Sequence, residues 1–267
     1  MFFSILFESP TYLKICLAAI LGSMVGSFFN VVIYRMPRGE SIVTPPSRCP
    51  VCQHRIKPWE NIPLFSWLLL RGKCSGCQTK IGMQYPLIEA LTGLTAALLT
   101  WDIIVHPNPI GTNIVYLYFA LCLIPIVIID FRHYLIPDAL TLTGIPIALA
   151  ASFLPNSRLL PWESLFGFLI SGFFLWGIGA LASWLLKKEA MGFGDVKLLA
   201  LAGACFGWQS ALIGLGIASI LGTLFGLPML WLKRLNQERH IPFGPFLCLG
   251  ALLAFRFQEP IYNWFFA

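Results

Sequence analysis

Apolar and polar residues are segregated along this chain into long apolar runs separated by shorter polar stretches. Among the runs that contain no charged residue are 15–34, 164–186 and 198–232, which are 20, 23 and 35 residues long. An uncharged run of about 18 residues or more predicts a spanning helix, whereas a transmembrane barrel shows only weak alternation. The 35-residue run is too long for one helix of about 20 residues, so we expect two helices with a turn at 207–210.

Extending this pattern to the whole chain predicts eight transmembrane helices. They are placed near 15–34, 87–105, 113–129, 139–154 and 164–186, twice within 198–232, and near 243–254. Only 11% of the 267 residues are charged, against about 25% in soluble domains, and the mean hydropathy is +0.77. The first run lacks the small-residue cleavage site of a removed signal peptide, so we expect it to remain as a helix. The predicted fold class is an all-α polytopic membrane protein.

Positive charge is concentrated in one polar loop, residues 35–86, which contains eight Lys or Arg and only two acidic residues. The positive-inside rule places such a loop in the cytoplasm. With eight helices, the loops 35–86, 130–138, 187–197 and 233–242 share that side and hold 15 of the 18 Lys and Arg residues. The basic charge therefore has a membrane explanation, which includes anionic lipid heads, and it predicts no nucleic-acid partner.

The same loop contains two C-x-x-C motifs, Cys49-Pro-Val-Cys52 and Cys74-Ser-Gly-Cys77, with 21 residues between them. This is close to the spacing of zinc ribbons, in which four thiolates form a tetrahedral shell around Zn²⁺. About 50 residues can bury little core, so a structural zinc would also explain how the loop stays folded. Two disulfides are the alternative, which a reducing cytoplasm disfavours.

Two aspartates adjoin the apolar runs on the predicted cytoplasmic side. Asp195 follows Gly192 and Gly194 in a Gly-x-Gly-Asp turn between the 23-residue and 35-residue runs, and Asp130 ends the uncharged stretch 113–129. A carboxylate in such surroundings costs about 2.5–3.5 kcal/mol at a helix centre and usually has a function. Because glycines let another chain approach closely, we predict an active-site turn with Asp130 and Asp195 as a catalytic pair. The simpler alternative is that Asp195 caps the next helix.

The positions of four acidic residues relative to helix ends lead to further expectations. Asp138 stands where a helix is predicted to start, so capping is favoured over catalysis. Glu89 lies just inside the second predicted helix and is either an interfacial anchor or part of a polar, cofactor-binding site. Asp130, at a helix C-terminus, should hold a proton more readily than Asp195, at an N-terminus.

Together these residues resemble the type IV prepilin peptidases, the leader peptidase/N-methyltransferases of pilus assembly and type II secretion. The resemblance depends on motifs that follow the family's order along nearly the whole chain. They are Gly26-Ser27-Phe28-Phe29-Asn30-Val31-Val32-Ile33-Tyr34-Arg35, the two C-x-x-C motifs, Asn61-Ile62-Pro63, Tyr85-Pro86-Leu87-Ile88-Glu89, Ile129-Asp130 with Ile136-Pro137-Asp138, 188–197 and Pro242-Phe243-Gly244-Pro245.

The resemblance implies a Gly-x-Gly-Asp aspartic protease of the bacterial inner membrane that removes the short basic leader of prepilins or pseudopilins at the cytoplasmic face. Asp130 and Asp195 are the implied catalytic pair. The implied domains are a first helix at 1–34, the zinc loop at 35–86 and a peptidase domain at 87–267. A second implied activity is methylation of the new N-terminus with S-adenosylmethionine, which the family associates with the loop. The residues alone show no glycine-rich turn of a methyltransferase fold, so this cofactor enters by resemblance only.

Two other classes of protein are compatible with parts of the sequence. A proton-coupled transporter would use the same aspartates, but it gives no reason for a four-cysteine loop. A noncatalytic membrane scaffold with a zinc loop leaves the Gly-x-Gly-Asp turn unexplained.

Overall fold

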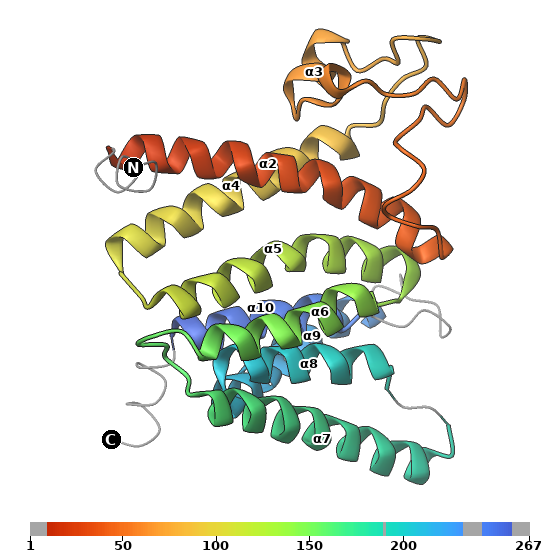
Figure 1. Ribbon diagram of the computed structural model, residues 1–267. Helices are drawn as coiled ribbons and strands as arrows, with labels where there is room; N and C mark the ends of the chain where they lie inside the picture. Colours follow the sequence, from red (N-terminus) through yellow and green to blue (C-terminus); the bar gives the residue numbers. More distant parts are fainter. Residues whose placement is uncertain (1–9, 189–190, 232–241, 258–267) are drawn as a thin grey trace. The chain divides into compact units, whose positions relative to one another are not determined.

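The computed structural model describes residues 10–188, 191–231 and 242–257, and every extended regular element in these ranges is a helix (Figure 1). The longer helices are α2 (Thr11–Arg35), α4 (Gln84–Val105), α5 (Ile110–His133), α6 (Asp138–Ser152), α7 (Pro161–Leu186), α8 (Phe193–Phe206), α9 (Trp208–Trp231) and α10 (Gly244–Arg256). The short ones are η1 (Met36–Arg38), η2 (Pro58–Asn61) and α3 (Phe65–Leu69). The predicted all-α class is confirmed, and a longer helix lies at each of the eight predicted places.

Five of these helices are long and apolar enough to cross a membrane: α2, α4, α5, α7 and α9. The other three, α6, α8 and α10, have 15, 14 and 13 residues. At 1.5 Å per residue they are about 20 Å long, which is less than the hydrocarbon core of about 30 Å. The prediction of a multi-pass helical membrane protein is therefore confirmed, but the count of eight full spans is not.

The chain divides into two compact units, residues 1–107 and 108–267. In unit 1, α2 packs along α4 with small residues at the contact. A Cβ atom added to Gly26 would lie 2.8 Å from the Cα of Glu89, and one added to Gly93 would lie 2.8 Å from the Ala19 carbonyl oxygen. The two backbones can approach this closely only because glycine has no side chain. The assignment of functional domains to 1–34, 35–86 and 87–267 stays a prediction.

Unit 2 is built around α8, whose residues 198–206 are all buried. Helices α5, α6, α7, α9 and α10 pack against it. The contact with α7 is close because Gly203 faces Gly167, and Ser164 Oγ donates a hydrogen bond to the Ala204 carbonyl at 2.7 Å. The central helix of the unit therefore carries Asp195 in its first turn, where its position is set by packing on several sides.

The turn that divides the 35-residue run lies at Gly207, between α8 and α9. Gly207 has φ +86°, a left-handed conformation that residues with a side chain rarely adopt. The predicted turn at 207–210 is thus confirmed. It consists of one residue, because α9 already begins at Trp208.

Candidate active site and metal centre

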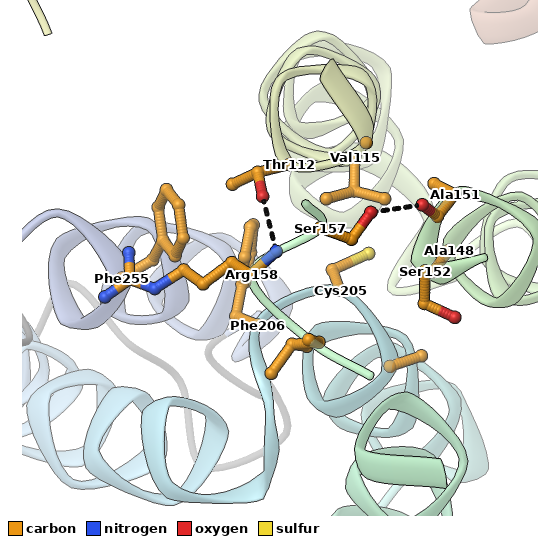
Figure 2. A pocket seen from close by; sticks show the side chains of 13 residues that line it. Thr112, Val115, Ala148, Ala151, Ser152, Ser157, Arg158, Cys205, Phe206 and Phe255 are labelled. Atoms are coloured by element: carbon orange, nitrogen blue, oxygen red, sulfur yellow. Dashed lines mark hydrogen bonds between the residues drawn. The ribbon is translucent and has the colours of Figure 1, made fainter. Parts of the chain in front are cut away.

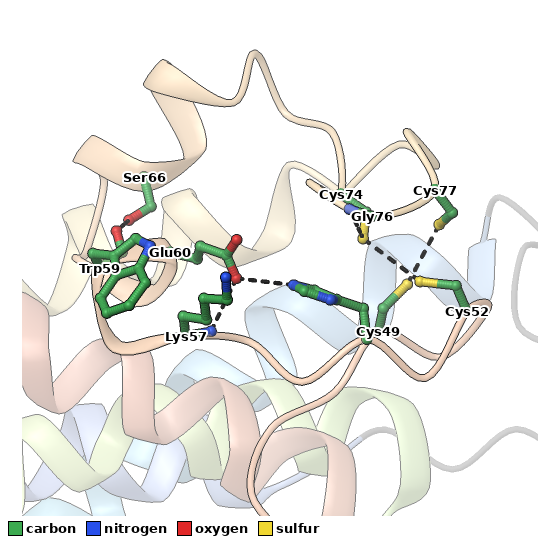
Figure 3. Close-up of polar contacts among 10 residues, drawn as sticks. Cys49, Cys52, Lys57, Trp59, Glu60, Ser66, Cys74, Gly76 and Cys77 are labelled. Atoms are coloured by element: carbon green, nitrogen blue, oxygen red, sulfur yellow. Dashed lines mark hydrogen bonds and ion pairs between the residues drawn. The ribbon is translucent and has the colours of Figure 1, made fainter.

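The four loop cysteines converge in unit 1, where all four sulfur atoms lie within 4.8 Å of one another (Figure 3). Cys49 Sγ is 3.8 Å from Cys77 Sγ, and Cys52 Sγ is 3.9 Å from Cys74 Sγ. A tetrahedron of Zn–S bonds of about 2.3 Å has edges of about 3.8 Å, so the sulfur positions fit a four-thiolate metal site. All four cysteines are free thiols, which contradicts the alternative of two disulfides.

The two C-x-x-C motifs fold as near repeats of each other. The backbone N–H of Cys49 donates to the His54 carbonyl at 2.9 Å, and that of Cys74 donates to Thr79 at the same distance. The residue after each motif, Gln53 or Gln78, has φ near +60° and returns a hydrogen bond to the first cysteine of its motif. Each motif is therefore a closed turn that presents two sulfurs on one side.

One thiol of the cluster is already biased toward the metal-binding form. The Thr79 hydroxyl, whose oxygen lies 3.2 Å from Cys77 Sγ, is the main reason that the pKa of Cys77 falls to about 6. Metals bind the thiolate rather than the thiol, so the Thr79 contact favours ligation through Cys77.

Beside the cysteines, Glu60 connects η2 to the first motif (Figure 3). Its Oε2 accepts a hydrogen bond from the Lys57 backbone N–H at 2.9 Å and lies 3.2 Å from His54 Nε2. The Lys57 N–H is the main cause that lowers the pKa of Glu60 to about 2. His54 is therefore held by a carboxylate and is not one of the cluster's ligands.

Glu89 is buried on α4 and accepts a hydrogen bond from the Leu64 backbone N–H at 2.8 Å. Leu64 has φ +63° and ψ −49°, and the N–H of Phe65 donates to the Pro63 carbonyl at 2.7 Å. These values define a γ-turn of the rare, strained kind. The contact shows that Glu89 holds the loop at Leu64, and both roles expected for Glu89, an interfacial anchor or a part in cofactor binding, stay predictions.

In unit 2, Asp130 lies in the last turn of α5 and Asp195 in the first turn of α8, as the positions of the apolar runs predict. Asp130 is 5% exposed, and the two carboxylates are close enough to interact electrostatically. The backbone N–H of Gly244, at the start of α10, donates to Asp130 Oδ2 at 3.1 Å. Three helix ends therefore meet where the aspartates meet.

Ile136 fills the space between these helix ends. A Cβ added to Gly194 would lie 3.0 Å from Ile136 Cβ, and one added to Gly244 would lie 3.1 Å from Ile136 Cδ1 and 2.7 Å from Asp130 Oδ2. Larger residues at either glycine would therefore push Ile136 or the Asp130 carboxylate away. The sequence pattern did not single out Ile136 or Gly244 as site residues, although both lie in motifs that carry the family resemblance.

The structure corrects the view of the Gly-x-Gly-Asp segment as a turn outside a helix. Gly192 is the N-cap of α8 with ordinary φ −71°, while Gly194 and Asp195 already belong to the helix. The Asp195 side chain makes no capping hydrogen bond, so the capping interpretation is wrong. Glycine is required at position 194 because Ile136 packs closely against it, and not because the backbone is left-handed.

Asp138 is the first residue of α6 rather than its N-cap, and it pairs with a lysine. Lys197 Nζ lies 2.7 Å from Asp138 Oδ1, and Lys197 is two residues beyond Asp195 on α8. This ion pair connects α6 to α8 next to the aspartates. It supports a structural rather than a catalytic role for Asp138.

A hollow of about 310 Å³, counting its open mouth, lies at the other end of unit 2 (Figure 2). Its walls include Thr112 near the start of α5 and Cys205 near the end of α8, whereas Asp130 and Asp195 lie at the opposite ends of these helices. Thr112 Oγ1 accepts a hydrogen bond from the Arg158 backbone N–H at 3.3 Å. The hollow is therefore separate from the carboxylate site.

A helical membrane unit with paired aspartates at its helix ends and a separate four-thiolate loop is the arrangement of an intramembrane aspartic peptidase with a metal-binding insert. Two family models match the chain in the same order: the bacterial peptidase A24 N-terminal domain over residues 20–103, and the type IV leader peptidase family over residues 117–227. The chain belongs to the type IV leader peptidase family.

Curated relatives match nearly the whole chain. A prepilin leader peptidase/N-methyltransferase of Stutzerimonas stutzeri is 34% identical over 277 residues, which cover 95% of this chain and 94% of the relative. The protein of the same name from Pseudomonas aeruginosa is 35% identical over 265 residues, which cover 91% of this chain and 90% of the relative. No solved structure matches the chain. The transporter alternative gains no support from these relatives.

Proposed function

We propose that this protein removes the leader peptide of prepilins or pseudopilins and methylates the N-terminus that cleavage exposes. The observation that supports the peptidase activity is that the ends of α5 and α8 bring Asp130 and Asp195 within electrostatic range of each other, with the Gly244 amide on one carboxylate. The methyltransferase activity is proposed from the names of the relatives, and S-adenosylmethionine is its methyl donor.

The contacts of Asp130 limit which of its oxygens can take part in proton transfer. Oδ2 accepts the Gly244 N–H, so Oδ1 is the oxygen left to carry a proton and to donate it to the scissile carbonyl. The other carboxylate, ionised, then activates water, so no covalent intermediate is required. The assignment of the protonated role to Asp130 follows from its place at a helix C-terminus, which is negative, and stays a prediction.

Gly192 is the position where a substrate backbone can come closest to the pair. A Cβ added there would meet only the Asp195 carboxylate, at 3.7 Å, whereas Gly194 is covered by Ile136. A helical substrate hides its carbonyls in hydrogen bonds, so we expect the scissile segment to unwind and lie extended beside Gly192.

We place the protein in the bacterial inner membrane with the loop and the aspartates on the cytoplasmic side. The support is the distribution of basic residues, since 15 of 18 fall in loops that share one side in the eight-helix arrangement predicted from the sequence. In the loop, the four cysteines would hold Zn²⁺, which would join the two C-x-x-C turns into one structure. This role for zinc is structural, because four protein ligands leave no open coordination position.

Cleavage of a purified prepilin in detergent tests the peptidase assignment. We expect Asp130→Asn and Asp195→Asn each to reduce leader removal to background while the proteins remain folded. Asp102→Asn, at the far end of α4, is the matched control and should cleave normally. Cleavage that survives either of the first two substitutions would remove that residue from the catalytic pair.

Metal and methyl transfer are tested in the same preparation. Cys74→Ser should lower the zinc content from about one ion per chain toward none, since three thiolates form an incomplete shell. Cys16→Ser, an exposed cysteine of α2 outside the cluster, should leave the zinc content unchanged. Transfer of a labelled methyl group from S-adenosylmethionine should fall in the Cys74→Ser protein and not in the control. Equal zinc content in both variants would exclude the cysteines as ligands.

A further inference from the structure

In the loop segment 59–69, large apolar side chains are exposed and a polar side chain is buried, which is the opposite of what is expected in water. Five large apolar side chains are exposed, with fractions between 50% and 78%: Trp59, Ile62, Phe65, Leu68 and Leu69. The polar residue Ser66 is buried instead, and its hydroxyl accepts from the Ile62 N–H at 2.8 Å and donates to the Trp59 carbonyl at 3.0 Å. Single exposed apolar residues are common, but five so close together indicate a non-aqueous neighbour.

This apolar segment 59–69 is ordered, so its exposure does not result from a lack of structure. Helical hydrogen bonds join the N–H of Ser66 to the Ile62 carbonyl at 3.0 Å and the N–H of Leu68 to the Leu64 carbonyl at 3.1 Å. The hydrogen bond from the Ser66 hydroxyl to the Trp59 carbonyl, shown in Figure 3, closes the same segment from within. The apolar side chains are therefore held outward by a fixed backbone.

The contact between Leu64 and Glu89 sets the level of the apolar segment along α4. Glu89 is the sixth residue of α4, which is one of the helices able to span a membrane. At 1.5 Å per residue it lies about 8 Å from the start of that helix. The Leu64 N–H is 2.8 Å from its carboxylate, so the segment lies beside the first turns of a spanning helix. That is the level at which a membrane surface meets the protein.

The exposed charges next to the apolar segment are positive. Lys57, Arg71 and Lys73 flank it and are exposed, and Lys57 Nζ lies 5.5 Å from the centre of the Trp59 ring. Glu60 is the one acidic residue in 57–73, and it is occupied by the Lys57 N–H and His54. Basic side chains around an aromatic and apolar surface complement an anionic lipid surface and would repel a basic leader peptide.

We propose that the apolar segment 59–69 is an interfacial membrane anchor, which inserts its side chains among anionic lipid headgroups and holds the four-cysteine loop against the bilayer. Trp59 sits at the headgroup level, where tryptophan is enriched, while Phe65, Leu68 and Leu69 reach the acyl boundary. The binding surface is distinct from both the aspartate site and the thiolate cluster, and it does not depend on the peptidase activity.

Photocrosslinking of the full-length protein in vesicles tests the anchor. Phe65 is replaced by p-benzoylphenylalanine, and the protein is reconstituted in phosphatidylcholine containing phosphatidylglycerol as about a quarter of the lipid, an anionic surface of the kind basic residues bind. Val51, in the first C-x-x-C motif, is the matched control, because it is 64% exposed against 67% for Phe65. We expect lipid adducts at position 65 in several-fold excess over position 51. Leu69 provides a second site if the Phe65 variant does not fold.

Omitting phosphatidylglycerol from the vesicles tests whether attraction between the basic side chains and anionic lipid contributes to membrane binding. The yield of lipid adducts at position 65 should fall by about fivefold or more, since each basic side chain contributes about that factor at an anionic surface. Changing Lys57, Arg71 and Lys73 together to Gln should remove this dependence on lipid charge. Equal adducts at positions 65 and 51, adducts to a second copy of the chain, or a yield insensitive to phosphatidylglycerol would each overturn the proposal.

Discussion

The loop of unit 1 and the aspartate site of unit 2 position their functional groups by different means. In the loop, each pair of cysteines is set by backbone hydrogen bonds that reach only a few residues along the chain, such as Cys49 to His54. In unit 2, Asp130 and its hydrogen-bond partner Gly244 are 114 residues apart, and close helix packing brings them together. A local motif can fold by itself around a metal, whereas the aspartate pair exists only when the whole helical unit is packed.

The largest effect that separates the two regions is expected from Gly203→Leu. A side chain at Gly203 would overlap the Gly167 carbonyl and Ser171 Oγ, so α7 and α8 would be forced apart. Overpacking of this kind costs about 3 kcal/mol or more. We expect leader cleavage to be lost while the zinc content of the loop is retained. Gly177→Leu, on an exposed face of α7 with nothing within 4 Å, should preserve both. Loss of zinc together with cleavage would contradict the independence of the two regions.

Gly244→Ala tests the geometry of the aspartate site without disturbing the helix contacts elsewhere. The added methyl group would lie 2.7 Å from Asp130 Oδ2 and must displace the carboxylate. Misplacement of a reacting group by about 1 Å can reduce the rate about 100-fold, so we expect kcat for leader removal to fall by about 10- to 100-fold. The measurement is kcat and KM on a purified prepilin. Gly216→Ala, a position with nothing within 4 Å, should change neither, and an unaffected Gly244→Ala protein would show that this contact is not needed.

Glu60→Gln is expected to lower the stability of the folded loop by a smaller amount that depends on pH. The pKa of Glu60 is lowered to about 2, so its ionised form stabilises the folded loop fully above its ordinary value of 4.5 and less as the pH falls toward 2. Hydrogen exchange of residues 55–66 should be faster in the variant at pH 7. The difference from the unmodified protein should shrink below about pH 4.5, where Glu60 begins to protonate in the unfolded chain. A difference that persists unchanged at pH 2 would be inconsistent with a role for the charge.

The smallest effect is expected from the pair of Lys197 and Asp138. The two atoms are 2.7 Å apart, but the Asp138 side chain is 57% exposed, and exposed ion pairs contribute about 0.2–1 kcal/mol. Lys197→Met and Asp138→Asn should each lower the melting temperature slightly and leave cleavage within a few-fold of normal. A double-mutant cycle measures the coupling. A loss of cleavage as large as that of the aspartate pair would give Asp138 a catalytic part that the geometry does not indicate.

The difference between local and long-range positioning also explains which features were predictable from the sequence. The C-x-x-C spacing is itself the geometry of the metal site, so the cluster of Cys49, Cys52, Cys74 and Cys77 follows directly from the sequence. Asp130 and Asp195 were predictable as well, because the uncharged runs place both at one membrane level. Their contacts with Ile136 and Gly244 were not, since the runs do not reveal which helices are neighbours.

The lengths of the helices were only partly predictable. Uncharged runs mark where apolar helices lie, and all eight are found. They do not show where a helix stops, because Gly, Pro and polar residues that end a helix also occur within apolar runs. Helices α6, α8 and α10, with 15, 14 and 13 residues, are shorter than a full span of about 20 residues.

The short helices α6, α8 and α10 have a consequence for the lipid around unit 2. Each is roughly 10 Å too short for the bilayer that the five longer helices match. Such hydrophobic mismatch is relieved when the bilayer thins locally or when water enters above the short helices. Since Asp195 lies at one end of α8 and Asp130 contacts α10, we expect the thinned region to lie beside the carboxylates. A thinner bilayer at these helix ends would shorten the path that water must take to reach a hydrolytic site.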